Sequence, residues 1–208
     1  MNLAAEVARK LLQIKAIKLS PQKPFTWASG IQSPIYCDNR IILSFPSVRN
    51  FIKQALTVEA AKFGEFDAVA GVATAGIAHG MLLADAIGKP FAYVRSKPKE
   101  HGRQNQVEGR INSGERVLVV EDLISTGGSR LQAVEVPREA GCEVVGVLAI
   151  FSYGFDKAER AFAAARCPFR TLSNYETLIR AAMETGDISG EDLQMLTSWR
   201  SEMGAAKA

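Results

Sequence analysis

Residues 117–129 read VLVVEDLISTGGS, and this stretch decides the fold. Its first four residues are apolar and mostly β-branched, without alternation of apolar and polar residues, which predicts a central parallel strand covered on both faces. Two carboxylates, Glu121 and Asp122, follow, and a turn rich in glycine and hydroxyl groups then opens an expected helix. Ligands of open α/β sheets bind beyond the carboxyl ends of the strands. The stretch therefore predicts a ligand site at this turn.

The turn and the two acids suit different parts of one ligand. Glycines let backbone N–H groups face an anion, hydroxyls add donors, and the N-terminus of a helix favours negative charge, so residues 125–129 suit a phosphate. Glu121 and Asp122 would repel a phosphate but can accept hydrogen bonds from a vicinal diol. Together they indicate a sugar phosphate. A lone Gly-Gly turn is often only a tight connection, and no Walker spacing is present.

Composition predicts a single soluble enzyme domain. The chain has 208 residues, of which 47% are hydrophobic and 23% charged, which are ordinary globular values. A net charge of +3 without a basic tail argues against a nucleic-acid partner. We find no signal peptide and no apolar run long enough to span a membrane. Three widely spaced cysteines and two histidines predict reduced thiols in a cytoplasmic protein, without a His/Cys metal cage.

The first part of the chain predicts a helix and a small hood. Asn2 can cap a helix that runs to about Ala16. Residues 17–40 hold prolines, aromatics and Gly30, which favour short strands and turns that either cover a substrate or form an ordinary loop. Pro46 can begin a helix that ends near Gly64. The expected parts of this single domain are a helix and hood at about 1–45, a core at about 46–172 and C-terminal helices at about 173–203.

Two further segments suit an anion. Residues 67–77 read as a buried strand and a turn of small residues, which can bind an anion through backbone amides or simply connect strand to helix. Residues 95–110 are polar, basic and rich in glycine, which is typical of a solvated loop but also suits a pyrophosphate. We expect His79 to be packed and satisfied, and Pro137 to kink a helix at 129–140 for no functional reason we can give. The other expected elements are strands 142–152 and 169–172 and helices 155–165, 175–183 and 191–203.

Four segments together resemble one enzyme family. Residues 25–40, 73–77, 94–102 and 117–129 are similar to the orotate phosphoribosyltransferases, a branch of the type I phosphoribosyltransferases, and the similarity covers nearly the whole chain. The last segment alone identifies only the superfamily. The resemblance implies an α/β fold with a central parallel sheet flanked by helices and a small hood. It also implies a homodimer in which the 95–110 loop of one subunit serves the active site of the other.

The resemblance implies a reaction as well. Ribose 5-phosphate would pass from 5-phosphoribosyl 1-pyrophosphate (PRPP) to orotate, giving orotidine 5′-monophosphate and pyrophosphate, a step of pyrimidine biosynthesis. The sequence holds no Ser-His-Asp or Cys-His constellation that would argue for a covalent nucleophile. Mg²⁺ would be the cofactor, bound through oxygens of PRPP with no direct protein ligand, since Mg²⁺ keeps waters and few protein ligands.

Site residues follow from the same resemblance. The implied catalytic residues are Lys99, His101 and Asp122. The implied PRPP-binding residues are Thr74, Ala75, Arg95, Lys99, His101, Glu121, Asp122, Leu123, Ile124, Ser125, Thr126, Gly127, Gly128 and Ser129. The orotate-binding candidates are Ser29, Tyr36, Arg40 and Ser125.

Three departures leave the base-binding details open. Ala28 stands where many relatives have a lysine, Tyr36–Cys37 replaces a phenylalanine pair, and Tyr153 replaces an arginine that meets the orotate carboxylate. One alternative is a phosphoribosyltransferase for another base, such as a purine. Another is a regulator that senses PRPP and binds RNA or DNA, against which stand the low net charge and the absence of a helix-turn-helix segment.

Overall fold

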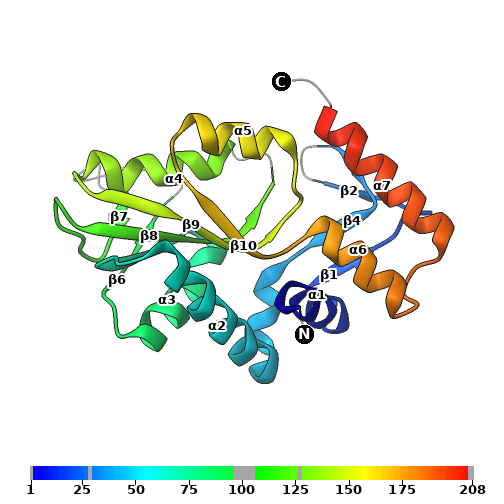
Figure 1. The fold of residues 1–208 in the computed structure, drawn as a ribbon, viewed down its shortest axis with the longest axis horizontal. Helices are drawn as coiled ribbons and strands as arrows, with labels where there is room; N and C mark the ends of the chain where they lie inside the picture. Colours follow the sequence, from blue (N-terminus) through cyan, green and yellow to red (C-terminus); the bar gives the residue numbers. More distant parts are fainter. Residues whose placement is uncertain (1, 28–29, 96–105, 126–127, 206–208) are drawn as a thin grey trace.

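The structure, a computed structural model, describes residues 2–27, 30–95, 106–125 and 128–205. Its centre is a six-stranded sheet in the order β10-β9-β8-β5-β6-β7 (Figure 1). The strands are β5 (Ala68–Val72), β6 (Phe91–Val94), β7 (Val107–Glu108), β8 (Arg116–Ile124), β9 (Glu143–Ser152) and β10 (Phe169–Asn174). All neighbours pair in parallel except β7, which runs antiparallel to β6. The predicted α/β class is confirmed.

Helices cover both faces of the sheet. The helices are α1 (Leu3–Gln13), α2 (Pro46–Ala60), α3 (Ala75–Ile87), α4 (Gly128–Glu139), α5 (Asp156–Ala164), α6 (Tyr175–Glu184) and α7 (Gly190–Ala205), with 3₁₀ turns η1 (Asn39–Ser44) and η2 (Ala61–Phe63). Figure 1 shows α4 and α5 on one face, and α2 and α3 on the other. Within the described residues no helix is both long enough and apolar enough to cross a lipid bilayer.

Strand β8 is buried on both faces, which accounts for its apolar sequence. Val117 and Val119 belong to the apolar cluster that includes α4 and α5, whereas Leu118 and Val120 belong to the cluster that includes α1, α2 and α6. All four side chains are fully buried. Because successive residues of a strand point to opposite faces, a strand covered on both faces has apolar residues throughout. The expected central strand is therefore confirmed.

The hood consists of two small antiparallel sheets. β1 (Ile17–Leu19) pairs with β4 (Ile35–Cys37), and β2 (Phe25–Thr26) pairs with β3 (Gln32–Ser33). Helix α7 holds this part in place, because the Trp199 indole N–H donates to the Gln32 carbonyl at 3.1 Å. The predicted short strands and turns are confirmed, and the C-terminal helix ties them to the core.

Two boundaries differ from the sequence expectation. The first helix, capped as expected by Asn2, ends at Gln13 because Lys15 adopts a positive φ of 59°. The polar segment that we expected to remain a loop as far as Arg110 already forms β7 at Val107, whose side chain is buried against the sheet. Pro137 lies in the last turn of α4, and Gly141, with φ of 84°, follows the helix end as expected.

Candidate active site

The carboxyl end of β8 presents one of its two acids to solvent. Glu121 is 1% exposed, and its Oε2 accepts a hydrogen bond of 3.0 Å from the N–H of Asp122. Asp122 is partly exposed. Neighbouring residues of a strand point to opposite faces, so the two carboxylates do not lie side by side. Asp122 is the acid that is accessible to a ligand in this structure, whereas ribose binding by Glu121 stays a prediction.

The turn after β8 leads into a helix, as the sequence predicted. Ser125 follows the strand and is partly exposed, and α4 begins at Gly128. Thr126 and Gly127 lie outside the described residues, and the hydroxyl role of Ser129 stays a prediction. The Ile124 side chain is buried, and its carbonyl accepts from the Tyr153 N–H at 3.1 Å. Ile124 can therefore meet a ligand only through its backbone.

A pocket of about 390 Å³ lies between the hood and the end of β8. It is lined by Thr26, Trp27, Tyr36, Cys37, Leu123, Ser125 and Tyr153. The rings of Trp27 and Tyr153 lie 5.4 Å apart with an angle of 34° between their planes. An apolar cavity with aromatic walls and a few hydroxyls suits a flat ring with polar edges. The structure thus brings together Tyr36 and Ser125, two of the residues predicted for the base.

Sequence reasoning missed part of this pocket. Trp27 was included only in the hood segment, and Tyr153 was noted only as the replacement of an arginine. In the structure the Trp27 ring, from the hood, packs against the Tyr153 ring, which follows β9. No local signal links them, because Trp27 and Tyr153 lie far apart in the sequence.

The thiol in this pocket is held in its protonated form. Burial raises the pKa of Cys37 well above its ordinary value, and the negative charges of Asp122 and Asp38 raise it further. The thiolate, not the thiol, is the nucleophile in cysteine chemistry. Cys37 therefore forms part of the pocket wall and is not a reactive group. Cys142 and Cys167 are also free thiols, as expected.

Arg40 lies outside the residues that line the pocket. Its guanidinium is largely exposed and pairs with Asp38 at 2.7 and 2.8 Å. This hydrogen bond is the main reason why the pKa of Asp38 is lowered. Ser29 lies outside the described residues, and the Gly30 N–H already donates to the Trp27 carbonyl at 2.8 Å. Base contacts by Ser29 and Arg40 therefore stay predictions.

The turn after β5, predicted as a second anion site, lies beside the end of β8. The Ala73–Thr74 peptide bond is cis, Thr74 is exposed, and Ala75 begins α3. A Cβ added to Gly76 would lie 2.5 Å from the Val120 carbonyl oxygen, so only glycine lets α3 approach β8 this closely. The start of α3 is thereby held next to the acids at the end of β8. The small residues of this turn have a packing reason in addition to their predicted role in binding pyrophosphate.

The cationic residues after β6 are described only in part. Arg95 follows β6, where its guanidinium lies 3.5 Å from the Glu108 carboxylate and its N–H donates to the Gln106 carbonyl at 2.8 Å. The side chain of Arg95 is 36% exposed. Lys99 and His101 lie outside the described residues. Their pyrophosphate contacts stay predictions.

His79 is packed in the core, as expected. The ring is 0% exposed, and neither nitrogen has a hydrogen-bond partner of normal geometry among the described residues. Burial lowers the pKa of His79, although the charge of Asp122 and the backbone of Asn39 act in the opposite direction. The packing of His79 is as expected, and its satisfaction by hydrogen bonds stays a prediction. The histidine is neutral at neutral pH and lies within the electrostatic influence of Asp122.

This burial predicts a loss of stability in mild acid. As the pH falls below 6.5, the unfolded chain protonates His79 before the folded chain does, so the free energy of unfolding decreases by at most about 1.4 kcal/mol per pH unit. We expect His79→Gln to show a flatter dependence between pH 7 and pH 5 in urea unfolding. His101→Gln, which removes the other histidine, is the matched control and should keep the wild-type slope. Equal slopes for His79→Gln and wild type would contradict this assignment.

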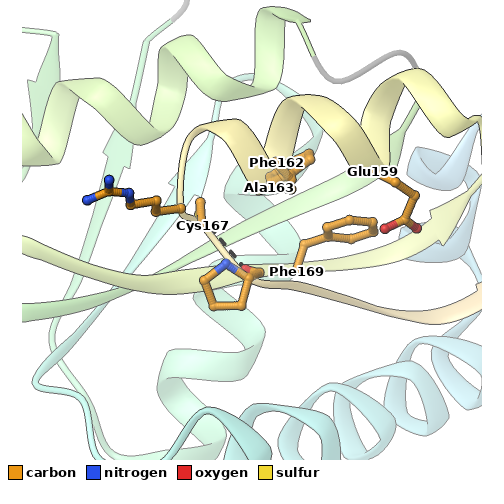
Figure 2. Close-up of a pocket in the computed structure, with 7 residues that line it drawn as sticks. Glu159, Phe162, Ala163, Cys167 and Phe169 are labelled. Carbon is orange, nitrogen blue, oxygen red and sulfur yellow. Dashed lines mark hydrogen bonds between the residues drawn. The ribbon is translucent and has the colours of Figure 1, made fainter.

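Another hollow lies away from this site. This pocket, of about 350 Å³, lies between the end of α5 and the start of β10. Figure 2 shows Glu159, Phe162, Cys167 and Phe169 in its lining. It opens at the amino end of a strand, whereas ligands of such sheets bind at carboxyl ends. Its walls include the Phe162 and Phe169 rings, whose centres lie 4.6 Å apart. We assign no function to it.

Comparison with known proteins defines the class. Residues 46–184 match the phosphoribosyl transferase domain, and the chain belongs to this family. Within the family, the chain is 55% identical over 202 residues to the orotate phosphoribosyltransferase of Bacteroides thetaiotaomicron, covering 97% of this chain and 95% of that protein. It is 52% identical over 201 residues to the orotate phosphoribosyltransferase of Listeria monocytogenes, covering 96% of each.

Solved structures agree with this assignment. Orotate phosphoribosyltransferase from Aeropyrum pernix superposes with a TM-score of 0.76 at 29% identity, covering 88% of this chain and 99% of that one. The Mycobacterium tuberculosis enzyme in complex with PRPP superposes with a TM-score of 0.65 at 26% identity, covering 84% and 98%. The predicted type I phosphoribosyltransferase fold is confirmed.

Proposed function

We propose that this chain is an orotate phosphoribosyltransferase, which transfers ribose 5-phosphate from PRPP to orotate and releases pyrophosphate. The observation that carries the proposal is the pocket that places Tyr36 and Ser125 in one cavity at the end of β8, next to Asp122. A flat base can pack against the aromatic wall of the pocket, and the sugar phosphate can bind to the acid and the turn. The high identity to named orotate enzymes supports this choice of base.

Each part of the site has a task in the reaction. Asp122 accepts hydrogen bonds from the ribose hydroxyls, and the turn before α4, with the positive end of the helix dipole, holds the 5′-phosphate. The aromatic pocket orients the base towards the anomeric carbon. The transition state places positive charge on the ribose and negative charge on the departing pyrophosphate. Positioning and electrostatic stabilisation therefore supply the rate, and the protonated Cys37 takes no covalent part.

Mg²⁺ fits this site as a partner of the substrate. Among the described residues no group of three or more His, Cys, Asp or Glu side chains could hold a metal ion. Mg²⁺ keeps several waters and binds substrate phosphates, so the oxygens of PRPP would hold the ion, without a direct protein ligand. When bound, Mg²⁺ would neutralise charge that develops on the pyrophosphate. Arg95, Lys99 and His101 are proposed to add positive charge to the same group.

The choice of base is tested by a panel of acceptors. Purified protein is given PRPP and Mg²⁺ with orotate, uracil, adenine or hypoxanthine, and pyrophosphate release is measured. We expect kcat/KM for orotate to exceed the values for the other three bases by at least about 1,000-fold, since uracil lacks the carboxylate and the two purines present a different pattern of donors and acceptors. Preference for adenine or hypoxanthine would refute the proposal and favour a purine enzyme. Turnover of none of the bases would favour a PRPP-sensing role.

The dimer with a shared loop is part of this proposal. The resemblance of the loop around Lys99 to the family supports the shared loop. We also propose a cytoplasmic location, which rests on the same resemblance and on the free thiols. The test mixes two inactive variants, Lys99→Ala and Asp122→Asn, under conditions that exchange subunits. If the loop acts on the neighbouring subunit, a mixed dimer has one intact site, and activity returns to roughly a quarter of wild type, because about half the dimers are mixed. No recovery despite demonstrated exchange would exclude the shared loop.

A further inference from the structure

Asn39 is a fully buried polar residue to which the proposed mechanism gives no task. It is 0% exposed and begins η1, two residues after the hood strand β4 ends. Its side-chain Nδ2 donates a hydrogen bond of 2.7 Å to the backbone carbonyl of Asp122. A buried amide that contacts the backbone of the ribose-binding acid is placed where it can affect the reaction.

The bond from Asn39 reaches β8 beyond the point where its pairing with β5 ends. The pairing of β5 with β8 ends at Gly71 and Val120, while β8 continues to Ile124. Asp122 therefore lies in a stretch that β5 no longer supports. Buried backbone carbonyls need a donor, and here a side chain from the hood side supplies one. Beyond Val120 strand β8 still pairs with β9 on its other side, and the bond from Asn39 ties this end of β8 to the chain segment that follows the hood.

Asn39 also lies close to the pocket wall. It follows Cys37, which lines the pocket, by two residues, and its side chain lowers the pKa of that thiol against the larger effect of burial. Its backbone lies against His79 on α3, the helix that begins at the second anion-binding turn. Its Oδ1 is buried without a hydrogen-bond partner among the described residues. Asn39 therefore lies at the junction of the base pocket, the ribose acid and the helix of the second turn.

We propose that Asn39 is a positioning residue that fixes Asp122 relative to the wall of the base pocket. Base and ribose must be held in one geometry for transfer, and small displacements of a catalytic group are costly. The Asn39 amide joins the two subsites through one donor group. This inference rests on the proposed function, because it assumes that Asp122 holds the ribose of PRPP.

The test is a double-mutant cycle. Asn39→Ala is made in wild type and in Asp122→Asn, and kcat/KM for PRPP is measured in all four proteins. We expect a decrease of about tenfold in wild type, the size of one buried hydrogen bond. In the Asp122→Asn background we expect a further decrease of less than about twofold, because residues that act through one another are not additive. Equal decreases in both backgrounds would overturn the proposal.

A matched control separates positioning from stability. Ser173 is 1% exposed, and its hydroxyl donates to the Ala4 carbonyl at 2.8 Å, away from the pocket. Ser173→Ala removes a comparable buried bond and should lower Tm while kcat/KM stays within about twofold of wild type. If Asn39→Ala likewise lowers Tm and leaves kcat/KM unchanged, its role is structural and the proposal fails. Should Asn39→Ala not fold, Asn39→Ser, which keeps a shorter donor, enters the same cycle under the same criteria.

A binding measurement distinguishes this proposal from the proposed function. The dissociation constant of PRPP with Mg²⁺ is measured by calorimetry for the same four proteins, without any base. Non-additive weakening confirms the link between Asn39 and Asp122 even if orotate proves to be the wrong base. Additive weakening refutes the link even if orotate turnover is normal.

Discussion

Asp122→Asn should lower kcat/KM for PRPP by about 10- to 150-fold, because a hydrogen bond to a charged group contributes about 1.5–3 kcal/mol. The carboxylate lies at the partly exposed end of β8, next to the base pocket. Asparagine is almost isosteric and keeps the backbone bonds to Glu121 and Asn39. Folding should therefore be retained, as measured by circular dichroism and Tm.

The matched control is another aspartate of the same sheet. Asp67 precedes β5 at the opposite end of the strands, where its Oδ2 accepts from the Arg116 N–H at 2.7 Å. Asp67→Asn likewise replaces a carboxylate by a neutral amide, but it should leave kcat/KM within about threefold of wild type. If Asp122→Asn, properly folded, behaves like Asp67→Asn, the assignment of the ribose to Asp122 is wrong.

Gly76→Ala should disrupt the site by displacing a helix. The added Cβ would lie 2.5 Å from the Val120 carbonyl oxygen, a backbone atom of the central strand that cannot move aside. Overpacking of this kind costs about 1–3 kcal/mol in stability. It would also move the start of α3 away from β8, and a shift of about 1 Å can lower activity roughly 100-fold. Tm and kcat/KM of the variant give both effects.

Gly190→Ala provides the control for this substitution. Gly190 begins α7, and a Cβ at this position meets no atom within 4 Å. The same chemical change should therefore leave both Tm and kcat/KM close to their wild-type values. Wild-type activity of Gly76→Ala would show that the close approach of α3 to β8 is not needed for the site.

The sequence predicted the framework of the site because local patterns determine it. A strand covered on both faces must be apolar throughout, so Val117–Val120 indicated β8, and the acids and glycines after it indicated the ligand end of the sheet. The helix that begins at Gly128 follows from the same stretch. These features depend on neighbours in the chain, which the sequence displays directly.

The base pocket could be predicted only in part because it is assembled from distant segments. Trp27 comes from the hood and Tyr153 from the residue after β9, and nothing in either local pattern says that the two rings meet. The bond from Asn39 to Asp122 joins residues 83 positions apart. The burial of Glu121 was missed as well, because two adjacent acids look equivalent in the sequence although a strand turns them to opposite faces.

The most direct test of the central claim is the identity of the product. Wild-type protein is incubated with PRPP, Mg²⁺ and orotate, and the mixture is analysed by mass spectrometry together with a pyrophosphate assay. We expect orotidine 5′-monophosphate and pyrophosphate to appear in equal amounts, and neither to form when orotate is omitted. Release of pyrophosphate without orotidine 5′-monophosphate, or no consumption of orotate by folded protein, would contradict the account.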